Sequence, residues 1–179
     1  MKKTRLSYKA GPKDDCGTPA YALDPLLPYL PKEWVVWEPA CGQQERIAKA
    51  LRNNGHFVLS TDIVWGLDFL TNNPIPDVCA IVTNPPYSSP LKGKFIQRCF
   101  DLGLPFALLV QVDTLGTKSF QRAAPGRPFE IMLLSERIDF YMPNKGYTKG
   151  GSDFASIWLC SGLLPEKVMF GKITKPEGM

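Results

Sequence analysis

Asn84 and Tyr87 enclose two prolines in the tetrapeptide Asn84-Pro85-Pro86-Tyr87, which directly follows an apolar run. Two consecutive prolines end a strand, because proline has no backbone N–H and its ring fixes φ. The Asn84 side-chain oxygen and the Pro85 carbonyl oxygen are both acceptors. Held on a rigid turn, they could bind both hydrogens of an exocyclic NH₂ group, while Tyr87 offers a flat face to a planar group. The alternative is a loop that ends a strand and whose tyrosine packs into the core.

A second group of candidate residues lies upstream. The segment EPACG, residues 38–42, ends an apolar run and leads into a helical pattern. In doubly wound sheets, ligands bind at such turns, and Gly42 would let the backbone approach a ligand closely. Asp62 lies 20 residues after Gly42, a spacing at which an acid commonly accepts hydrogen bonds from ribose hydroxyls. Glu38, Gly42 and Asp62 together predict a site for a nucleoside-containing ligand, although any α/β protein has glycine turns of this kind.

These residues need a scaffold in which several strands end at one edge, and the hydrophobic pattern predicts one. Nearly continuous apolar runs indicate strands that are covered on both faces. These runs are residues 34–37, 57–60, 78–83, 106–112, 130–134 and 155–160. Between them, residues 43–55 and 91–103 place apolar side chains at helical spacing, and each segment ends on a glycine. The alternation predicts an α/β fold with an open, doubly wound and mostly parallel sheet.

The remaining segments have weaker patterns. Thr18-Pro19 and Asp24-Pro25 each resemble an N-cap followed by proline, which predicts two short helices before the first strand. Residues 113–128 and 141–153 are basic and have no strong period, so we predict that both are loops.

Composition limits the classes of protein that fit. The 179 residues, 44% of them hydrophobic, suffice for one core and predict a single domain over residues 1–179. The net charge of +4 is compatible with a nucleic-acid partner without requiring one. Five cysteines without a C-x-x-C pair, and one histidine, predict reduced thiols and no metal site. The absence of a signal peptide and of a membrane-length apolar run predicts a protein of the bacterial or viral-host cytoplasm, with no membrane partner.

Taken in order, the motifs resemble those of the S-adenosylmethionine-dependent amino-methyltransferases, and most closely the DNA adenine-N6 methyltransferases. The segments that carry the resemblance are DDCGTP (14–19), EPACG (38–42), TDI (61–63), LDF (67–69), NPPY (84–87), ERIDFYMP (136–143) and FASIWL (154–159). The resemblance implies a Rossmann-like methyltransferase fold of seven strands with an antiparallel closing hairpin. It also implies an enzyme that flips an adenine out of DNA and methylates its N6 amine, with S-adenosyl-L-methionine as cofactor.

The same resemblance implies roles for individual residues. Asn84, Pro85, Pro86 and Tyr87 would be catalytic, with the first two holding the target amine and Tyr87 stacking on the target base. The cofactor-binding residues would be Thr18, Pro19, Glu38, Pro39, Ala40, Gly42, Asp62, Ile63, Asp68 and Phe69.

The basic segments supply candidates for contact with DNA, and ordinary solvated loop charge is the alternative. These candidates are Lys118, Phe120, Arg122, Arg127, Lys145, Tyr147 and Lys149. Because the chain leaves no room for a separate target-recognition domain, we expect low sequence specificity, a short recognition site, or a partner that supplies the specificity.

One position departs from the family pattern. The family turn usually reads Gly-x-Gly, and Gln44 occupies the place of its second glycine. This departure leaves open a methyltransferase-like binding protein that has lost turnover. The tetrapeptide also leaves open an enzyme that methylates an RNA base or a protein glutamine.

Overall fold

The computed structural model describes residues 16–143, 145–148 and 150–176, and seven strands of this part form one sheet. Their order across the sheet is β2-β1-β3-β4-β8-β5-β9. The bounds are β1 Val35–Glu38, β2 Phe57–Ser60, β3 Ala80–Thr83, β4 Phe106–Gln111, β5 Glu130–Leu134, β8 Ser156–Ser161 and β9 Val168–Gly171.

All strands but one run in the same direction. β1 pairs in parallel with β2 and β3, β3 pairs in parallel with β4, and β5 pairs in parallel with β9. Only β8 is antiparallel, and it lies between β4 and β5. The predicted mostly parallel, seven-stranded, Rossmann-like sheet is therefore confirmed, and β2, β1, β3 and β4 present their carboxyl ends at one edge.

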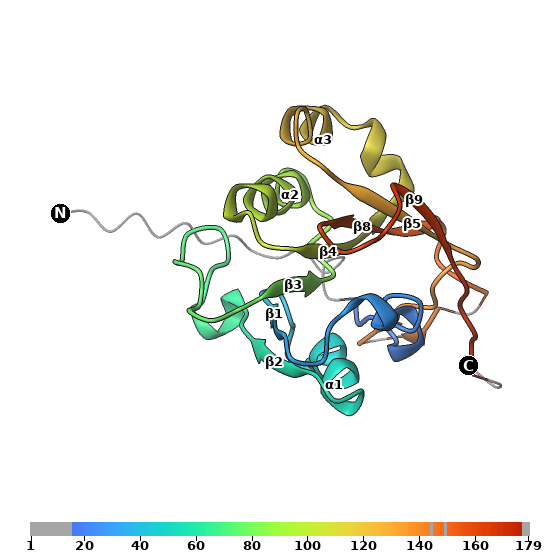
Figure 1. Cartoon of the computed structure of the whole chain (residues 1–179). Coiled ribbons are helices and arrows are strands. Elements are labelled where there is room, and N and C mark those ends of the chain that lie inside the picture. The colour runs from blue at the N-terminus through green and yellow to red at the C-terminus, as the bar shows by residue number, and fades with distance from the viewer. Residues whose placement is uncertain (1–15, 144, 149, 177–179) are drawn as a thin grey trace.

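Helices cover both faces of the sheet (Figure 1). α2 and α3 lie on one face, whereas α1 and the short N-terminal helices η1 and η2 lie on the other. The bounds are α1 Arg46–Asn53, α2 Leu91–Leu102, α3 Lys118–Ala123, η1 Ala20–Ala22, η2 Leu27–Tyr29, η3 Ile63–Trp65 and η4 Val112–Gly116. Each face has its own buried apolar cluster, which explains why the central strands are apolar on both sides. Among the described residues, no helix has the length and apolar character needed to cross a membrane.

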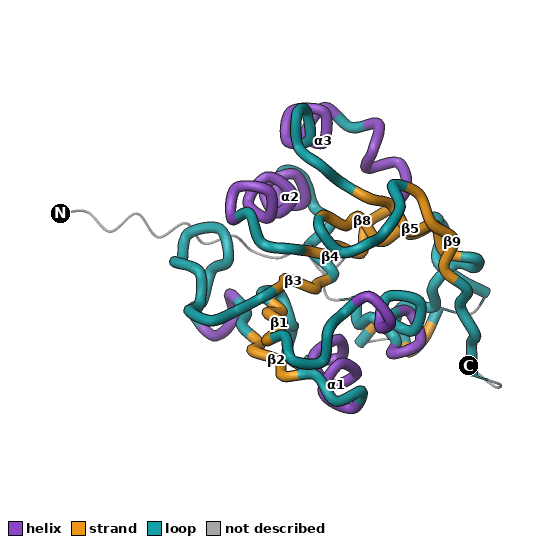
Figure 2. The backbone as a smooth tube through the Cα atoms, viewed as in Figure 1, coloured by secondary structure: helices purple, strands orange, loops and turns teal. Residues whose placement is uncertain are grey.

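Several predicted boundaries were wrong for physical reasons. Residues 113–128 are not a loop: they contain η4 and α3, and the Thr117 hydroxyl accepts a hydrogen bond from the backbone N–H of Phe120 to cap α3. Residues 141–153 contain the small hairpin of β6 Tyr141–Met142 and β7 Gly146–Tyr147. β9 was not predicted, because this edge strand exposes Phe170 (83% exposed) and buries little. The connection from η3 to β3, unlike the two segments predicted as loops, contains neither helix nor strand (Figure 2).

The predicted N-terminal helices are present as single 3₁₀ turns, with different caps. Pro19, rather than Thr18, is the N-cap of η1, and Leu26 is the N-cap of η2. η1 is attached to the rest of the fold by Tyr21, whose buried hydroxyl accepts from the backbone N–H of Asp139 at 2.8 Å and donates to the Asp139 carboxylate at 3.2 Å. The same carboxylate also contacts Lys175 Nζ at 2.6 Å.

We expect Tyr21→Phe to lower the free energy of unfolding by about 1–3 kcal/mol, because it leaves the buried N–H of Asp139 without its acceptor. Urea unfolding measures this loss. Tyr29→Phe is the matched control, since Tyr29 lies in η2 and is only partly buried. Equal stability of the two variants would contradict the importance of the Tyr21 hydrogen bonds.

Candidate active site

Four polar side chains lie where four neighbouring parallel strands end. Glu38 is the last residue of β1, Asp62 follows β2 by two residues, Asn84 directly follows β3, and Gln111 is the last residue of β4. Parallel pairing places all four carboxyl ends at the same edge of the sheet. This is the edge at which open α/β sheets bind their ligands. The first three residues were predicted from the sequence and Gln111 was not, because it lies inside the apolar run 106–112 rather than after it.

Three adjoining pockets open at this edge, and Asn84 alone among the described residues lines all three. We name them the Glu38, Asp62 and Tyr87 pockets. The shared wall means that groups bound in different pockets would meet at Asn84.

The predicted cofactor residues divide between two of the pockets. The Glu38 pocket is lined by Thr18, Glu38, Ala40 and Gly42, together with Cys16, Gly17, Cys41, Gln43, Gln44, Arg46, Ile47, Tyr141 and Pro143. The Asp62 pocket is lined by Pro39, Asp62, Ile63, Asp68 and Phe69, together with Ala40, Gly42, Leu70, Pro86, Leu91 and Phe95. Of the predicted set, only Pro19 is outside both linings; it instead caps η1.

The Asn84 amide has one bonded end and one unbonded end. Its Nδ2 donates to the Thr18 hydroxyl at 3.1 Å, whereas its Oδ1 is buried and has no hydrogen-bond partner among the described residues. A buried acceptor without a partner costs about 1–3 kcal/mol. An acceptor left unpaired at the junction of three pockets is the arrangement expected where a ligand supplies the missing donor. Thr18, predicted to contact a cofactor, thus also orients Asn84.

Glu38 is an acid with almost no access to water. It is 2% exposed, and its Oε2 accepts a 2.7 Å hydrogen bond from the backbone N–H of Ala48 in α1. Burial raises its pKa from the ordinary 4.5 to about 8, and the Ala48 hydrogen bond opposes this shift only in part. A cation in the Glu38 pocket would compensate the buried charge and would favour the ionised carboxylate.

The turn after β1 is tied to the turn after β2. The Asp62 carboxylate accepts from the backbone N–H of Gly42 at 2.8 Å and from that of Val64 at 3.0 Å. Gly42 has φ +61°, a left-handed conformation that glycine adopts without strain. The residues that precede Glu38 and Asp62 are also joined, because the Trp37 indole N–H donates to the Thr61 hydroxyl at 2.9 Å. Asp62 is therefore held rigidly at the pocket wall.

The Asp62 pocket combines apolar walls with a few polar groups. Phe69 is buried between Trp37 and Phe95, with ring centroids 5.2 and 4.8 Å away. Asp68 stabilises its own turn, because its Oδ1 accepts from the backbone N–H of Leu70 at 2.9 Å. A pocket with flat apolar sides and carboxylates at its rim suits an adenosine-like group.

Aromatic rings surround the Tyr87 pocket, whose remaining lining includes Asn84, Pro85 and Gln111. Tyr87 packs edge-to-face on Phe154 at 5.6 Å, and Phe154 lies 6.0 Å from Phe140. The Tyr87 hydroxyl donates to the Leu109 carbonyl at 3.3 Å, and burial raises the pKa of this phenol. Phe140 and Phe154 were in motif segments but were not predicted site residues, because the segment after β5 that carries them is distant in sequence from Asn84 and Tyr87.

Arg46 lies at the edge of the Glu38 pocket, held between side chains of the β6–β7 hairpin. Its guanidinium lies 4.0 Å from the Tyr141 ring centroid and donates to the Tyr147 hydroxyl at 3.0 Å and to Gln44 Oε1 at 2.6 Å. A side chain at Gly17 would require the Arg46 side chain to shift from this position. Gln44, which takes the place of the family's second glycine, is exposed and accepts the hydrogen bond from Arg46. The residue with a left-handed backbone conformation is its neighbour Glu45, at φ +47°.

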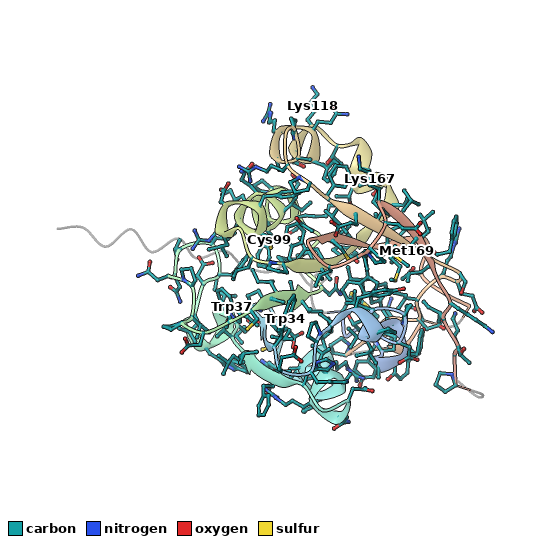
Figure 3. All side chains as sticks on the ribbon, viewed as in Figure 1. Trp34, Trp37, Cys99, Lys118, Lys167 and Met169 are labelled. Atoms are coloured by element: carbon teal, nitrogen blue, oxygen red, sulfur yellow. The ribbon has the colours of Figure 1, made fainter. Side chains whose placement is uncertain are left out.

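The predicted DNA contacts are only partly available. Phe120 is 6% exposed and packs edge-to-face on Phe129, so the prediction of a wedge or stacking role for Phe120 was wrong. Arg127 forms an ion pair with Asp101 at 2.8 Å, and Tyr147 binds Arg46. Three of the predicted basic side chains are exposed, namely Lys118, Arg122 and Lys145, and Lys118 projects outward from α3 in Figure 3. Lys149 lies outside the described residues.

Comparisons with known proteins bear on the fold. No family model and no curated protein matches the sequence. The chain resembles the crystal structure of a modification subunit of a putative type I restriction enzyme from Vibrio vulnificus YJ016, with a TM-score of 0.52 and 16% identity over 95% of the chain. It also resembles a predicted O-methyltransferase from Agrobacterium tumefaciens, with a TM-score of 0.44, 13% identity, and coverage of 90% of this chain and 89% of that one.

The likeness to the Vibrio subunit shows the fold alone, a Rossmann-like α/β fold. The chain spans about half, 49%, of the length of the Vibrio subunit. Within the described residues, no group of three or more histidine, cysteine, aspartate or glutamate side chains is arranged to hold a metal ion.

Because the pKa of Glu38 is raised, we predict that the stability of the protein decreases as the pH rises. Between about pH 5 and pH 8 the folded protein keeps a proton on Glu38 that the unfolded chain has lost. The free energy of unfolding therefore decreases as the pH rises, by at most about 1.4 kcal/mol per pH unit. We expect Glu38→Gln to lose this dependence, so its stability relative to the wild type increases with pH. Urea unfolding at about pH 5.5, 6.5 and 7.5 tests this, with the exposed Glu33→Gln as control. A constant difference between Glu38→Gln and wild type at all three pH values would contradict it.

Proposed function

We propose that the chain is an S-adenosyl-L-methionine-dependent methyltransferase that acts on the N6 amine of adenine in DNA. The unpaired, buried Oδ1 of Asn84 at the junction of the three pockets is the observation that carries the proposal. The sequence resemblance and the shared fold support it independently. The cytoplasmic location and the DNA partner of low sequence specificity belong to the same proposal.

The residues of two pockets fit the parts of the cofactor. The buried Glu38 carboxyl suits the cationic amino-acid end, and Arg46 at the same pocket suits its carboxylate. The Asp62 pocket suits the adenosine, with Asp62 toward the ribose hydroxyls and Phe69 beside the adenine ring. When bound, the cofactor supplies an electrophilic methyl group on a sulfonium centre.

Asn84 and Pro85 would prepare the amine for transfer. Asn84 Oδ1 accepts one N–H of the amine and the Pro85 carbonyl accepts the other, so the nitrogen lone pair turns away from conjugation with the ring. Thr18 fixes the Asn84 amide, and the two prolines fix the turn, so both acceptors are in place before the reaction. The amine held by Asn84 and Pro85 would be positioned to accept the methyl group from the bound cofactor, with S-adenosylhomocysteine as the leaving group, and to release a proton to water. Positioning supplies the acceleration, and no covalent enzyme intermediate is needed.

The lining of the Tyr87 pocket favours a planar group, such as a base, as the methyl acceptor. Three aromatic rings line it, and stacking of a base on an aromatic side chain contributes roughly 1–3 kcal/mol. Because a base inside a duplex cannot reach such a pocket, it would have to flip out at a cost of a few kcal/mol. Exposed Lys118, Arg122 and Lys145 remain candidates for phosphate contact, which would make DNA binding weaken as salt is added.

The function is tested by incubating the protein with labelled S-adenosylmethionine and with DNA, RNA or protein in parallel, followed by nucleoside and amino-acid analysis. Label in N6-methyladenine of DNA is the expected result. Label in RNA or in protein glutamine would show that RNA or protein, rather than DNA, is the methyl acceptor. Absence of both transfer and cofactor binding would favour a methyltransferase-like binding protein without turnover.

We expect Asn84→Ala to lower methyl transfer by at least about a hundredfold, because the amine loses its fixed acceptor. Binding of S-adenosylhomocysteine, measured by calorimetry, should remain mostly intact. Asn73→Ala, in the exposed connection before β3, is the matched control and should behave as wild type. Near-normal transfer by Asn84→Ala would show that this residue does not hold the amine.

We expect Arg46→Met to weaken the binding of ligands that carry the amino-acid carboxylate. The wild type should bind S-adenosylhomocysteine more tightly than 5′-methylthioadenosine, which lacks that carboxylate. The variant should reduce this preference about ten- to hundredfold, the contribution of a charge-assisted hydrogen bond. Arg52→Met removes a charge from the same helix, on the side of Glu45 and Ser60, and serves as control. An unchanged preference in Arg46→Met would exclude this role.

A further inference from the structure

The Tyr87 pocket contains a second side-chain amide, whose orientation is set from outside the pocket. Gln111 lines the pocket, and its Oε1 accepts a 3.0 Å hydrogen bond from Nζ of Lys92 in α2. Lys92 itself is not part of the pocket lining. A lysine ammonium group has three donors and no acceptor, so only the carbonyl oxygen of the amide can face it. The NH₂ end of Gln111 is therefore the end left for the pocket.

Lys92 is held in place by more than this one hydrogen bond. Its Nζ lies 5.6 Å from the Tyr87 ring centroid, and its stem leaves the first turn of α2. Burial lowers the pKa of Lys92, and the Asp113 carboxylate opposes this by favouring the charged form. The Lys92 ammonium group thus orients the Gln111 amide and also lies beside the Tyr87 ring, which forms a wall of the pocket.

Asn84 and Gln111 give the pocket an acceptor and a donor. Asn84 Oδ1 is the unpaired acceptor, and Gln111 Nε2 is the donor, with Tyr87 and Phe154 on the pocket wall. We propose that Gln111, oriented by Lys92, is a specificity-determining residue that donates a hydrogen bond to the ring nitrogen beside the target amine. This inference rests on the function proposed above, and it names the chemical edge that the site reads.

The donor and acceptor pair selects among bases. Adenine presents N1 as an acceptor next to its N6 amine, and cytosine presents N3 next to its N4 amine. On the Watson–Crick edge of guanine, an N–H donor lies beside the amine and would oppose the Gln111 NH₂. Thymine and uracil have no exocyclic amine for Asn84. A site built to hydrogen-bond a group rejects an analogue that lacks it, because its own polar atoms are then left unpaired.

The test pairs a change in the enzyme with a change in the base. Wild type and Gln111→Leu are each assayed on DNA with adenine, or with 1-deazaadenine, at the same target position. The analogue has C–H in place of N1, so it cannot accept the hydrogen bond. We expect the wild type to prefer adenine in kcat/KM about ten- to hundredfold more strongly than Gln111→Leu does. Differences in amine reactivity or base pairing act on both enzymes alike, and they cancel in the ratio of the two preferences.

Three further variants separate recognition from folding. Gln111→Glu keeps the size and the Lys92 contact but presents an acceptor, so it should lose the preference even if Gln111→Leu fails to fold. Lys92→Met should weaken the preference, because the amide can then turn, whereas Lys92→Arg keeps a donor-only partner and should retain it. Gln97→Leu, which removes a glutamine amide from the surface of α2, is the matched control.

The outcomes distinguish this inference from the proposed function. If the wild type methylates adenine in DNA but Gln111→Leu and Gln111→Glu keep its full preference over 1-deazaadenine, the role of Gln111 is overturned and the proposed function stands. If the wild type methylates neither substrate, the proposed function fails and the inference fails with it. A reduced preference with transfer to 1-deazaadenine unchanged supports the inference, because a general structural defect would lower both activities.

Discussion

The parallel pairing of β2, β1, β3 and β4 is the constraint on which the site depends. It sets the carboxyl ends of four strands side by side, so Glu38, Asp62, Asn84 and Gln111 lie along one edge although the chain separates the first from the last by more than seventy residues. Both faces of β1, β3 and β4 are buried, which fixes the register of these strands, whereas the edge strand β2 exposes Phe57 and Leu59. The polar residues at the strand ends are therefore positioned by an apolar core that none of them helps to build.

At this edge, each of the four polar side chains is held in place by a hydrogen bond from another residue. Ala48 binds Glu38, Gly42 binds Asp62, Thr18 binds Asn84, and Lys92 binds Gln111. Each of these side chains still lines a pocket. The unpaired oxygen of Asn84 has a cost in stability that the surrounding core offsets. A fixed acceptor of this kind needs no reorganisation when a donor arrives, which is the arrangement that favours catalysis by positioning.

Sequence patterns predicted the parts of the fold in which burial determines the residue type. The six apolar runs were strands, and Glu38, Asp62 and Asn84 were found because they end such runs. The pattern failed where tertiary contacts decide: β9 is an exposed edge strand, and Phe120 is buried by packing on Phe129 in a segment with no clear period. The orientation of Arg46 depends on two tyrosines of a hairpin far downstream, so no local pattern could indicate it.

The segment that leads into the β6–β7 hairpin contributes walls to two of the pockets that meet at Asn84. Phe140 lines the Tyr87 pocket, whereas its neighbour Tyr141 lines the Glu38 pocket and packs on Arg46. Successive residues of an extended chain point to opposite sides, so one peptide unit contributes a wall to each pocket. Tyr141 also pairs through its backbone with Gly17, next to the Thr18 that orients Asn84. The backbone pairing of Tyr141 with Gly17 therefore places the wall formed by Phe140 and Tyr141 next to the segment whose Thr18 fixes the Asn84 amide.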